Sequence, residues 1–432
     1  MNELLATSVP VVPAAATPPA PAASASGVRF TGIRSDFRHL ITRGALLEFV
    51  TLGFYRFWLA TDVRRHLWSH TEVGGDTAEY TGTAKELLIG FLFALAILVP
   101  IYLAYFFITL EAERWVAFAS VPLFLFFYLF TQFAVYRARR YRLTRTVFRG
   151  IRFHQGGSPM RYAFYALFWW TFSALTLGLA YPWQIASLER YKMRNTFYGD
   201  LAGRFDGSGL RLFIRGLPMW FLVVAPLVVT VGAFVETVDW TALIDALSQG
   251  GDDTMGRLEG ASPGLAGLIV FAMLMAGTSI AAVAILYPAF HAMVLRWWCS
   301  GLRFGEIEFH SRLATLSIYT AYGRFLGIAL LFSLALGIAA FPALYVAGWL
   351  SGTEGSVRSE LLGWAMFIIG YVVAALGYST IYQATVKFSF WQLAMESLQL
   401  SRLEALERVK ATGLPSSAVG EGLADALNVG GY

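Results

Sequence analysis

Charged residues are scarce in this sequence, and cysteine is almost absent. Asp, Glu, Lys and Arg make up 14% of the 432 residues, against about 25% in typical soluble domains. So few charges cannot cover the surface of a soluble protein of this length, which excludes a soluble globular fold. The single cysteine, Cys299, excludes an intramolecular disulfide and a cysteine-based metal cluster.

The sequence also lacks the short motifs that support most enzyme and nucleotide-binding predictions. It contains no GxGxxG, GxxxxGK[ST] or GxSxG motif, so the dinucleotide, P-loop and hydrolase classes have no support. We therefore predict no enzymatic activity and no cofactor. Nucleic-acid binding is not expected either, because a net charge of +5 is typical of a membrane protein with basic cytoplasmic loops.

Hydrophobic residues are abundant instead. They form 57% of the chain, with 35 Phe, and the mean hydropathy is +0.57. The segments that exceed the ~20 apolar residues needed to cross a bilayer are 86–110, 115–135, 212–235, 264–292, 322–350 and 361–385. The cores of the first four contain no Asp, Glu, His, Lys or Arg, which argues against an ion-driven transporter.

Two further segments, 38–58 and 161–183, are ambiguous. The first contains Glu48 and Arg56, which are poor residues for a span but the best candidates for buried polar groups; the second is apolar but broken at Gly178. We predict an all-α polytopic membrane protein with six to eight transmembrane helices. Eight result if both segments cross, and six if both are interfacial or re-entrant.

The charge distribution favours six crossings. If neither ambiguous segment crosses, 30 of the 33 Lys and Arg fall on one side, and only Arg114, Arg257 and Arg358 fall on the other. The positive-inside rule then places both termini in the cytoplasm, with 236–263 and 351–360 outside. Eight crossings would also leave both termini inside, but they would place the basic residues 59–85 outside.

A duplicated TLG-x4-W motif marks the two ambiguous segments. A shift of 125 residues aligns the two copies without a gap. The candidate turn residues are Thr51, Leu52, Gly53, Trp58, Thr176, Leu177, Gly178 and Trp183. Because glycine permits unusual backbone angles, we expect Gly178→Leu to impair folding more than Gly264→Leu, since Gly264 is expected only to begin a helix.

A second signature, GxRF, occurs at 27–30, 150–153 and 301–304. Together the signatures predict about three repeated membrane units. The expected division is a disordered Ala/Pro-rich tail at 1–27, unit 1 at 28–150, unit 2 at 151–300, a degenerate unit 3 at 301–392 and a cytoplasmic tail at 393–432.

Two further features accompany these signatures: an Arg-rich stretch after TLG-x4-W, and an aromatic-x-Gly step (Tyr80 to Gly82 and Phe205 to Gly207). Together with TLG-x4-W and GxRF, they resemble the bacterial YjgN-type inner-membrane protein family. The resemblance covers roughly residues 28–410. It implies a multi-pass protein of the bacterial inner membrane and no particular activity, because the family is a domain of unknown function.

Seven arginines follow the second predicted span. They are Arg137, Arg139, Arg140, Arg142, Arg145, Arg149 and Arg152. Beside a membrane helix such residues can bind anionic lipid headgroups, so membrane lipids are the predicted partners; the alternative is that the cluster only fixes topology. Cys299 is expected at the cytoplasmic interface, where a maleimide would reach it after lysis.

His66 and His70 have the i, i+4 spacing of a helical metal site, but no third ligand is evident in the sequence. We therefore predict an interfacial pair and no metal.

Two functions fit these features. The first is a transporter or carrier for an uncharged or lipid-like substrate, in which the TLG turns meet to form the site, because carriers bind at broken helices between repeats. The alternative is a non-transporting envelope or lipid-organising protein with a basic cytoplasmic face. An intramembrane enzyme ranks third, for want of a paired acid and base.

Overall fold

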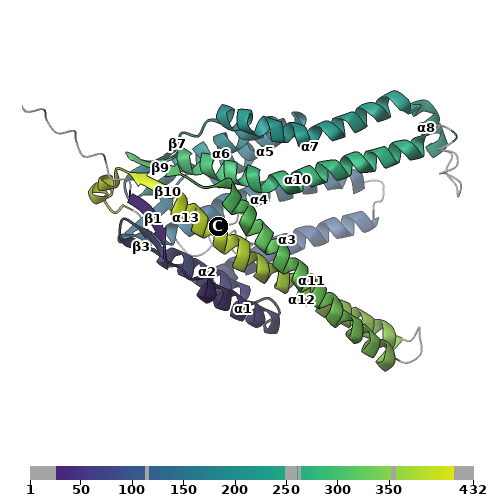
Figure 1. The fold of residues 1–432 in the computed structure, drawn as a ribbon, viewed down its shortest axis with the longest axis horizontal. Helices are drawn as coiled ribbons and strands as arrows, with labels where there is room; N and C mark the ends of the chain where they lie inside the picture. The colour runs from purple at the N-terminus through teal and green to yellow at the C-terminus, as the bar shows by residue number, and fades with distance from the viewer. Residues whose placement is uncertain (1–25, 112–115, 249–259, 261–263, 352–356, 413–432) are drawn as a thin grey trace, which may run out of the picture.

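The computed structural model describes residues 26–111, 116–248, 260, 264–351 and 357–412. Helices dominate this part of the chain, and ten short strands gather at one end of the molecule (Figure 1). The expected tail at 1–27 lies almost wholly outside the described residues, except that Ser26 and Gly27 belong to the first strand.

The strands close into one antiparallel barrel, in the order β1-β10-β9-β8-β7-β6-β5-β4-β3-β2. The sequence analysis does not predict them. Their bounds are Ser26–Phe30 (β1), Thr71–Val73 (β2), Asp76–Tyr80 (β3), Thr146–Phe148 (β4), Ile151–Gln155 (β5), Thr196–Tyr198 (β6), Leu201–Phe205 (β7), Leu302–Phe304 (β8), Ile307–Ser311 (β9) and Leu398–Ser401 (β10).

Two-residue turns join β2 to β3, β4 to β5, β6 to β7 and β8 to β9. Each turn contains a glycine at positive φ, for example Gly74 at 61° and Gly150 at 75°. Such angles give the primed turns whose twist matches that of the flanking strands. The fifth junction is between the ends of the chain, where Gly27 pairs with Gln399. The barrel therefore closes only when the first and last strands meet.

Pairs of helices connect the strands. Their bounds are Arg34–Val50 (α1), Arg56–Ser69 (α2), Ala84–Glu111 (α3), Val116–Thr144 (α4), Pro159–Leu175 (α5), Tyr181–Arg194 (α6), Gly209–Thr237 (α7), Trp240–Ser248 (α8), Leu265–Gly301 (α10), Thr315–Ser351 (α11), Val357–Tyr382 (α12) and Phe388–Ser397 (α13), with a π-helical stretch η2 at Gln383–Lys387 and a 3-10 helix η3 at Leu403–Arg408.

Among the described residues, six helical segments are long and apolar enough to cross a membrane, as the sequence predicts. They are Ala84–Ile108, Ser120–Thr144, Gly209–Thr237, Leu265–Gly301, Thr315–Pro342 and Gly363–Ser397. In contrast, α1 and α5 have 17 residues each, or about 25 Å at ~1.5 Å per residue. This is less than the ~30 Å thickness of the hydrocarbon core.

The same order of elements occurs five times: a long strand, a helix, a reversal, a second helix and a short strand. Each of the first two expected units, 28–150 and 151–300, covers about two of these five sets, whereas the third begins near the end of the fourth set. The GxRF residues 27–30 and 150–153 lie on or beside β1 and β5, which precede helices, whereas 301–304 ends α10 and forms β8, which follows one. The matched spacing therefore joins residues that are not structurally equivalent.

The helices that run directly into short strands, α2, α4, α6, α10 and α13, form a closed ring above the barrel. Neighbours in the ring are joined by Phe57 with Tyr141 in one buried cluster, Arg139 with Glu189, Glu189 with Trp298, Leu295 with Leu393 against another apolar cluster, and Trp391 with Trp68. The most buried side chains lie near this ring and the barrel, whereas the long helices expose apolar surface, as expected for helices facing lipid.

The expected tail at 393–432 is incorrect in its first part. Residues 393–401 complete α13 and β10 inside the ring and barrel. The chain then continues as η3, and the backbone of Lys410 pairs with Asp200 in the β6–β7 turn. Residues 413–432 lie outside the described part of the chain.

Candidate functional site

The two TLG motifs form the reversals between α1 and α2 and between α5 and α6. Both reverse the chain with two successive residues at positive φ, Leu52 at 50° and Gly53 at 91°, and Leu177 at 49° and Gly178 at 84°. Leucine rarely adopts this conformation, so the surrounding hydrogen bonds must hold it. The Thr, Leu and Gly of each motif therefore lie in the turn that joins the two helices of a hairpin.

The threonine of each motif caps both helices. The Thr176 hydroxyl donates to the Phe172 carbonyl at 2.9 Å and accepts from the Ala180 amide at 3.1 Å. Thr51 does the same with Leu47 and Tyr55, at 2.7 and 3.0 Å. One side chain thus satisfies a carbonyl at the end of the first helix and an amide at the start of the second.

The two turns lie on opposite sides of the helix assembly, with α1 along its lower edge and α5 and α6 along its upper edge in Figure 1. The expectation that they meet to form one site is therefore wrong. The helix ring stands between them, because each hairpin contributes only its second helix, α2 or α6, to that ring.

The second turn contacts the neighbouring helix α7, whereas the space around Gly53 in the first turn is open. The Trp220 indole on α7 donates to the Leu177 carbonyl at 2.7 Å, while nothing lies within 4 Å of the position a Cβ would take at Gly53. Trp183 packs on Phe213 of α7 with ring centroids 4.9 Å apart, whereas Trp58 stacks on Tyr55 of its own hairpin.

An apolar cleft of about 360 Å³ opens beside the second turn. It lies between the turn, α7 and α10, and Leu217, Val224 and Phe290 are among the residues that line it. The volume and the apolar lining are typical of small-molecule sites. The second TLG hairpin therefore borders an apolar candidate binding site, whereas the hollow of about 390 Å³ between α1 and α2 is lined largely by polar residues such as Asp36 and Arg43.

Few polar groups face this cleft. They include the hydroxyl groups of Ser173 and Tyr181 and, across the cleft, that of Tyr287. Burial, reinforced by Tyr287, raises the pKa of Tyr181 above its usual value, so the phenol stays neutral and can donate a hydrogen bond. The cleft therefore suits an uncharged or acyl group better than an ion.

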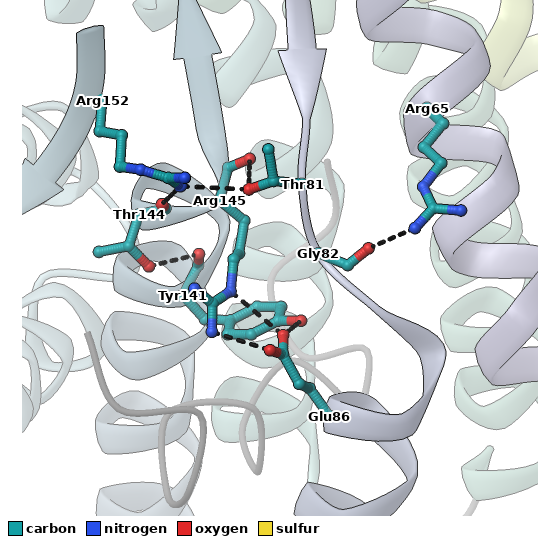
Figure 2. A network of polar contacts seen from close by, with 8 residues as sticks. All are labelled: Arg65, Thr81, Gly82, Glu86, Tyr141, Thr144, Arg145 and Arg152. Atoms are coloured by element: carbon teal, nitrogen blue, oxygen red, sulfur yellow. Dashed lines mark hydrogen bonds and ion pairs between the residues drawn. The ribbon is translucent and has the colours of Figure 1, made fainter. Parts of the chain in front are cut away.

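Most of the seven predicted headgroup arginines bind groups within the protein. Arg145 forms a bidentate ion pair with Glu86 of α3, with Nη2 2.9 Å from Oε1, and the Tyr141 hydroxyl donates to the same carboxylate at 2.7 Å (Figure 2). Arg152 donates to the Thr81 hydroxyl and the Thr144 carbonyl (Figure 2). These contacts join the start of α3 and the end of α4 to the barrel.

The others follow the same pattern. Arg149 pairs with Asp76 at 2.6 Å, Arg140 donates to the Gly156 and Gly157 carbonyls, and Arg139 lies 3.7 Å from Glu189. Arg137 and Arg142 also have interactions with other groups. The structure does not test lipid binding by these residues, but it uses most of them as internal links.

A family profile for bacterial proteins of unknown function, DUF898, matches residues 25–426. The chain belongs to the DUF898 family. The YjgN-type resemblance is thereby confirmed over nearly the whole chain. No curated protein and no solved structure matches it.

In this DUF898 protein, sequence reasoning missed a recurring arginine contact. Arginines on four ring helices each donate to a carbonyl 17 residues further on, after the next long strand. The pairs are Arg65 with Gly82, Arg140 with Gly157, Arg190 with Gly207 and Arg296 with Leu313. The constant spacing is visible in the sequence, and the 125-residue shift already aligns Arg65 with Arg190.

A charged cluster inside the ring was also missed. Glu189 of α6 pairs with Lys192 and Arg139 and accepts from the Trp298 indole at 3.1 Å. Burial alone would raise the pKa of Glu189, but Lys192 and Arg139 hold it below its usual value. The carboxylate thus stays ionised and links three helices, α4, α6 and α10.

The other polar candidates have local roles. The His66 and His70 rings lie at a tilt of 36° with centroids 4.3 Å apart, and His70 Nδ1 lies 2.7 Å from the His66 carbonyl oxygen. Burial raises the pKa of Glu48, opposed by Arg56. The Arg56 guanidinium lies over the Phe57 and Phe91 rings, as at an interfacial helix end.

Proposed function

We propose that this DUF898 protein is a non-enzymatic carrier of a lipid-like molecule in the bacterial inner membrane. The observation that carries the proposal is the apolar cleft at the second TLG turn. A site where two short helices reverse beside long membrane helices is the arrangement in which carriers hold substrates. Its apolar lining matches an acyl chain.

Re-entry of the two short hairpins is part of this proposal. Their tips are apolar and exposed: Val50 retains 76% of its surface, Leu52 90% and Leu175 78%. At a water interface this exposure would be unfavourable, at about 25 cal/mol per Å². We infer that both tips enter the hydrocarbon from the barrel side and turn back within it. A lipid could then reach the cleft sideways.

The proposed orientation places the barrel in the cytoplasm. It is supported by the basic residues gathered there and by the meeting of β1 and β10, which brings both described ends of the chain to the barrel. We also infer that the five strand–helix–helix–strand units are related repeats. The four arginine contacts of equal spacing support this inference.

The experiment is photocrosslinking followed by a transport assay. A phospholipid with a diazirine in its acyl chain should label the cleft of the reconstituted wild-type protein. Gly216 borders the cleft and leaves room for a Cβ, with Met293 Cε at 3.7 Å as its nearest neighbour. Gly216→Phe should abolish this labelling, because the ring occupies the cleft.

Gly232 on the same helix is the matched control. Nothing lies within 4 Å of its Cβ position, and Gly232→Phe should label normally. Wild-type protein should also move a fluorescent lipid between the leaflets of liposomes, and Gly216→Phe should not. Labelling of the cleft without movement would favour the lipid-organising alternative. Absence of labelling would contradict the carrier proposal.

A further inference from the structure

A second hollow, distinct from the apolar cleft, lies at the base of the α5–α6 hairpin. Its volume is about 940 Å³, and it is bordered by α5, α6, β7 and the β8–β9 turn. Its polar lining consists mainly of Arg161, Arg190, Arg194, Arg204, Tyr165 and Asp206. Four positive charges thus face one negative charge.

The single acid in the hollow is already neutralised. Arg204 Nε lies 2.9 Å from one Asp206 oxygen, and Arg303 Nε lies 3.8 Å from the other. Arg190 donates to the Gly207 carbonyl at 3.0 Å, a neutral partner that leaves its charge uncompensated. In the described part of the chain, no hydrogen bond or ion pair involves the guanidinium groups of Arg161 and Arg194. The hollow therefore has a net positive charge available to a ligand.

The side chains of α5 indicate where the hollow lies relative to the membrane surface. Arg161 lies in the first turn of this helix, three residues after the Ser158 cap. The next turns expose large apolar side chains, with Phe164 at 56% and Phe168 at 63%. Such a surface belongs in hydrocarbon, so Arg161 lies at the level of the headgroups. Tyr165 borders the hollow at this level, where aromatic residues are enriched.

We propose that this hollow binds the phosphate of an anionic phospholipid headgroup. Guanidinium groups bind phosphate oxygens with two parallel hydrogen bonds, and the volume accommodates a headgroup. The site differs from the arginine cluster at 137–152, whose side chains are largely engaged within the protein. The proposal rests on the re-entry of the α5–α6 hairpin proposed above but not on transport, because a headgroup can be held without being moved.

The test uses the full chain in a neutral detergent. Binding of phosphatidylglycerol, phosphatidylcholine and inorganic phosphate is measured by native mass spectrometry. Phosphatidylglycerol should bind at least tenfold more tightly than phosphatidylcholine, whose choline cation balances its phosphate. The double variant Arg161→Gln, Arg194→Gln should lower phosphatidylglycerol affinity by about 25-fold, because each surface charge contributes about fivefold.

The matched control is the double variant Arg211→Gln, Arg215→Gln. Arg211 is the counterpart of Arg161 on α7, since its amide donates to the Ser208 cap at 3.4 Å as that of Arg161 does to Ser158. Neither Arg211 nor Arg215 borders the hollow. The control should retain wild-type affinity, and thermal unfolding should show that both double variants are folded.

Each remaining outcome is decisive. Inorganic phosphate that binds the wild type and not the Arg161/Arg194 variant, without any preference among lipids, would support the phosphate chemistry with a free anion as its source. Equal losses in the two double variants would mean general surface attraction and would overturn the proposal. So would equal binding of both lipids combined with no binding of phosphate.

Discussion

Arg65, Arg140, Arg190 and Arg296 show how one residue type links elements that local structure cannot join. Each lies six residues before a short strand and donates to the loop after the following long strand. The bond fixes the angle between the helix that enters a strand hairpin and the helix that leaves it. Arg161 and Arg194, which lack such carbonyls, are left for an external anion.

We expect Arg296→Gln to lower the free energy of unfolding by about 1–3 kcal/mol, because the Leu313 carbonyl loses a charged donor. Thermal unfolding in detergent measures the effect. Arg211→Gln, which removes an exposed arginine from α7, should leave the midpoint nearly unchanged. Equal midpoints for the two variants would show that the recurring contact contributes nothing to stability.

Cys299 lies near the expected membrane interface, but it is not accessible to solvent. It lies at the barrel end of α10, but only 2% of its surface is exposed, and it packs in a cluster with Val28 and Ile307. The expectation that a maleimide reaches it after lysis is therefore wrong for the folded protein. We expect labelling only after denaturation in SDS; rapid labelling of native membranes would contradict the packing around β1 and α10.

At the scale of elements, the TLG hairpin is determined by local hydrogen bonds. Thr176 caps both helices, and Gly178 takes a positive φ that permits the reversal. Gly264, expected only to begin a helix, itself has φ 94°. It is therefore unsuitable for comparison, and Gly232, in the middle of α7, takes its place.

Gly178→Leu should destabilise the protein by about 1–2 kcal/mol, the cost of forcing an L-residue into the left-handed region. Gly232→Leu should have little effect, because its Cβ meets open space. The two unfolding midpoints in detergent test this difference. If the variants melt alike, the turn does not depend on its glycine.

The contact between α4, α6 and α10 depends on Glu189, and it should respond to pH. Its folded-state pKa lies below the ordinary value of 4.5. The stabilisation is therefore complete above that value and is lost as the pH falls through the folded-state pKa. Glu189→Gln should cost about 3–5 kcal/mol at neutral pH, because it leaves Lys192 and Arg139 uncompensated.

Thermal unfolding of wild type and Glu189→Gln between pH 7 and pH 3 tests this prediction. The difference between the two midpoints should be largest at pH 7 and should shrink below about pH 4.5, as the wild-type carboxylate becomes protonated. A difference that stays constant with pH would mean that the carboxylate does not act through its charge.

At the scale of the whole molecule, each helix pair begins and ends beside a strand of the closed barrel, so these helix ends lie together at one end of the molecule. The long helices extend away from this end (Figure 1). A chain whose first and last strands are neighbours has both described ends on one side of the membrane. In the orientation that we propose, this side is the cytoplasm, because basic residues gather there.

Reporter fusions test this topology. Alkaline phosphatase fused after Tyr432 should be inactive, and the same enzyme fused at Asp252, between α8 and α10, should be active. A cytoplasmic fluorescent reporter should give the reverse pattern. Strong phosphatase activity at Tyr432 would invert the proposed orientation.

The sequence by itself determined the class of protein, the six long apolar helices that could span a membrane and the positions of the two TLG turns. These properties depend on local composition and local hydrogen bonds. A span requires only a continuous apolar stretch, and the TLG turn is capped by a side chain at its own position. Family membership follows from the same local motifs, which is why a resemblance over roughly 28–410 agreed with a match over 25–426.

Only the tertiary structure decided the barrel, the ring and the two hollows. Strands of three to five residues are too short to carry a periodic signal, and β1 meets β10 only because the fold brings the two ends of the chain together. The apolar cleft combines α7 and α10 with the second turn. The role of each arginine was likewise undecidable from sequence, because a guanidinium is a structural link or an anion site according to which neighbours the fold brings to it.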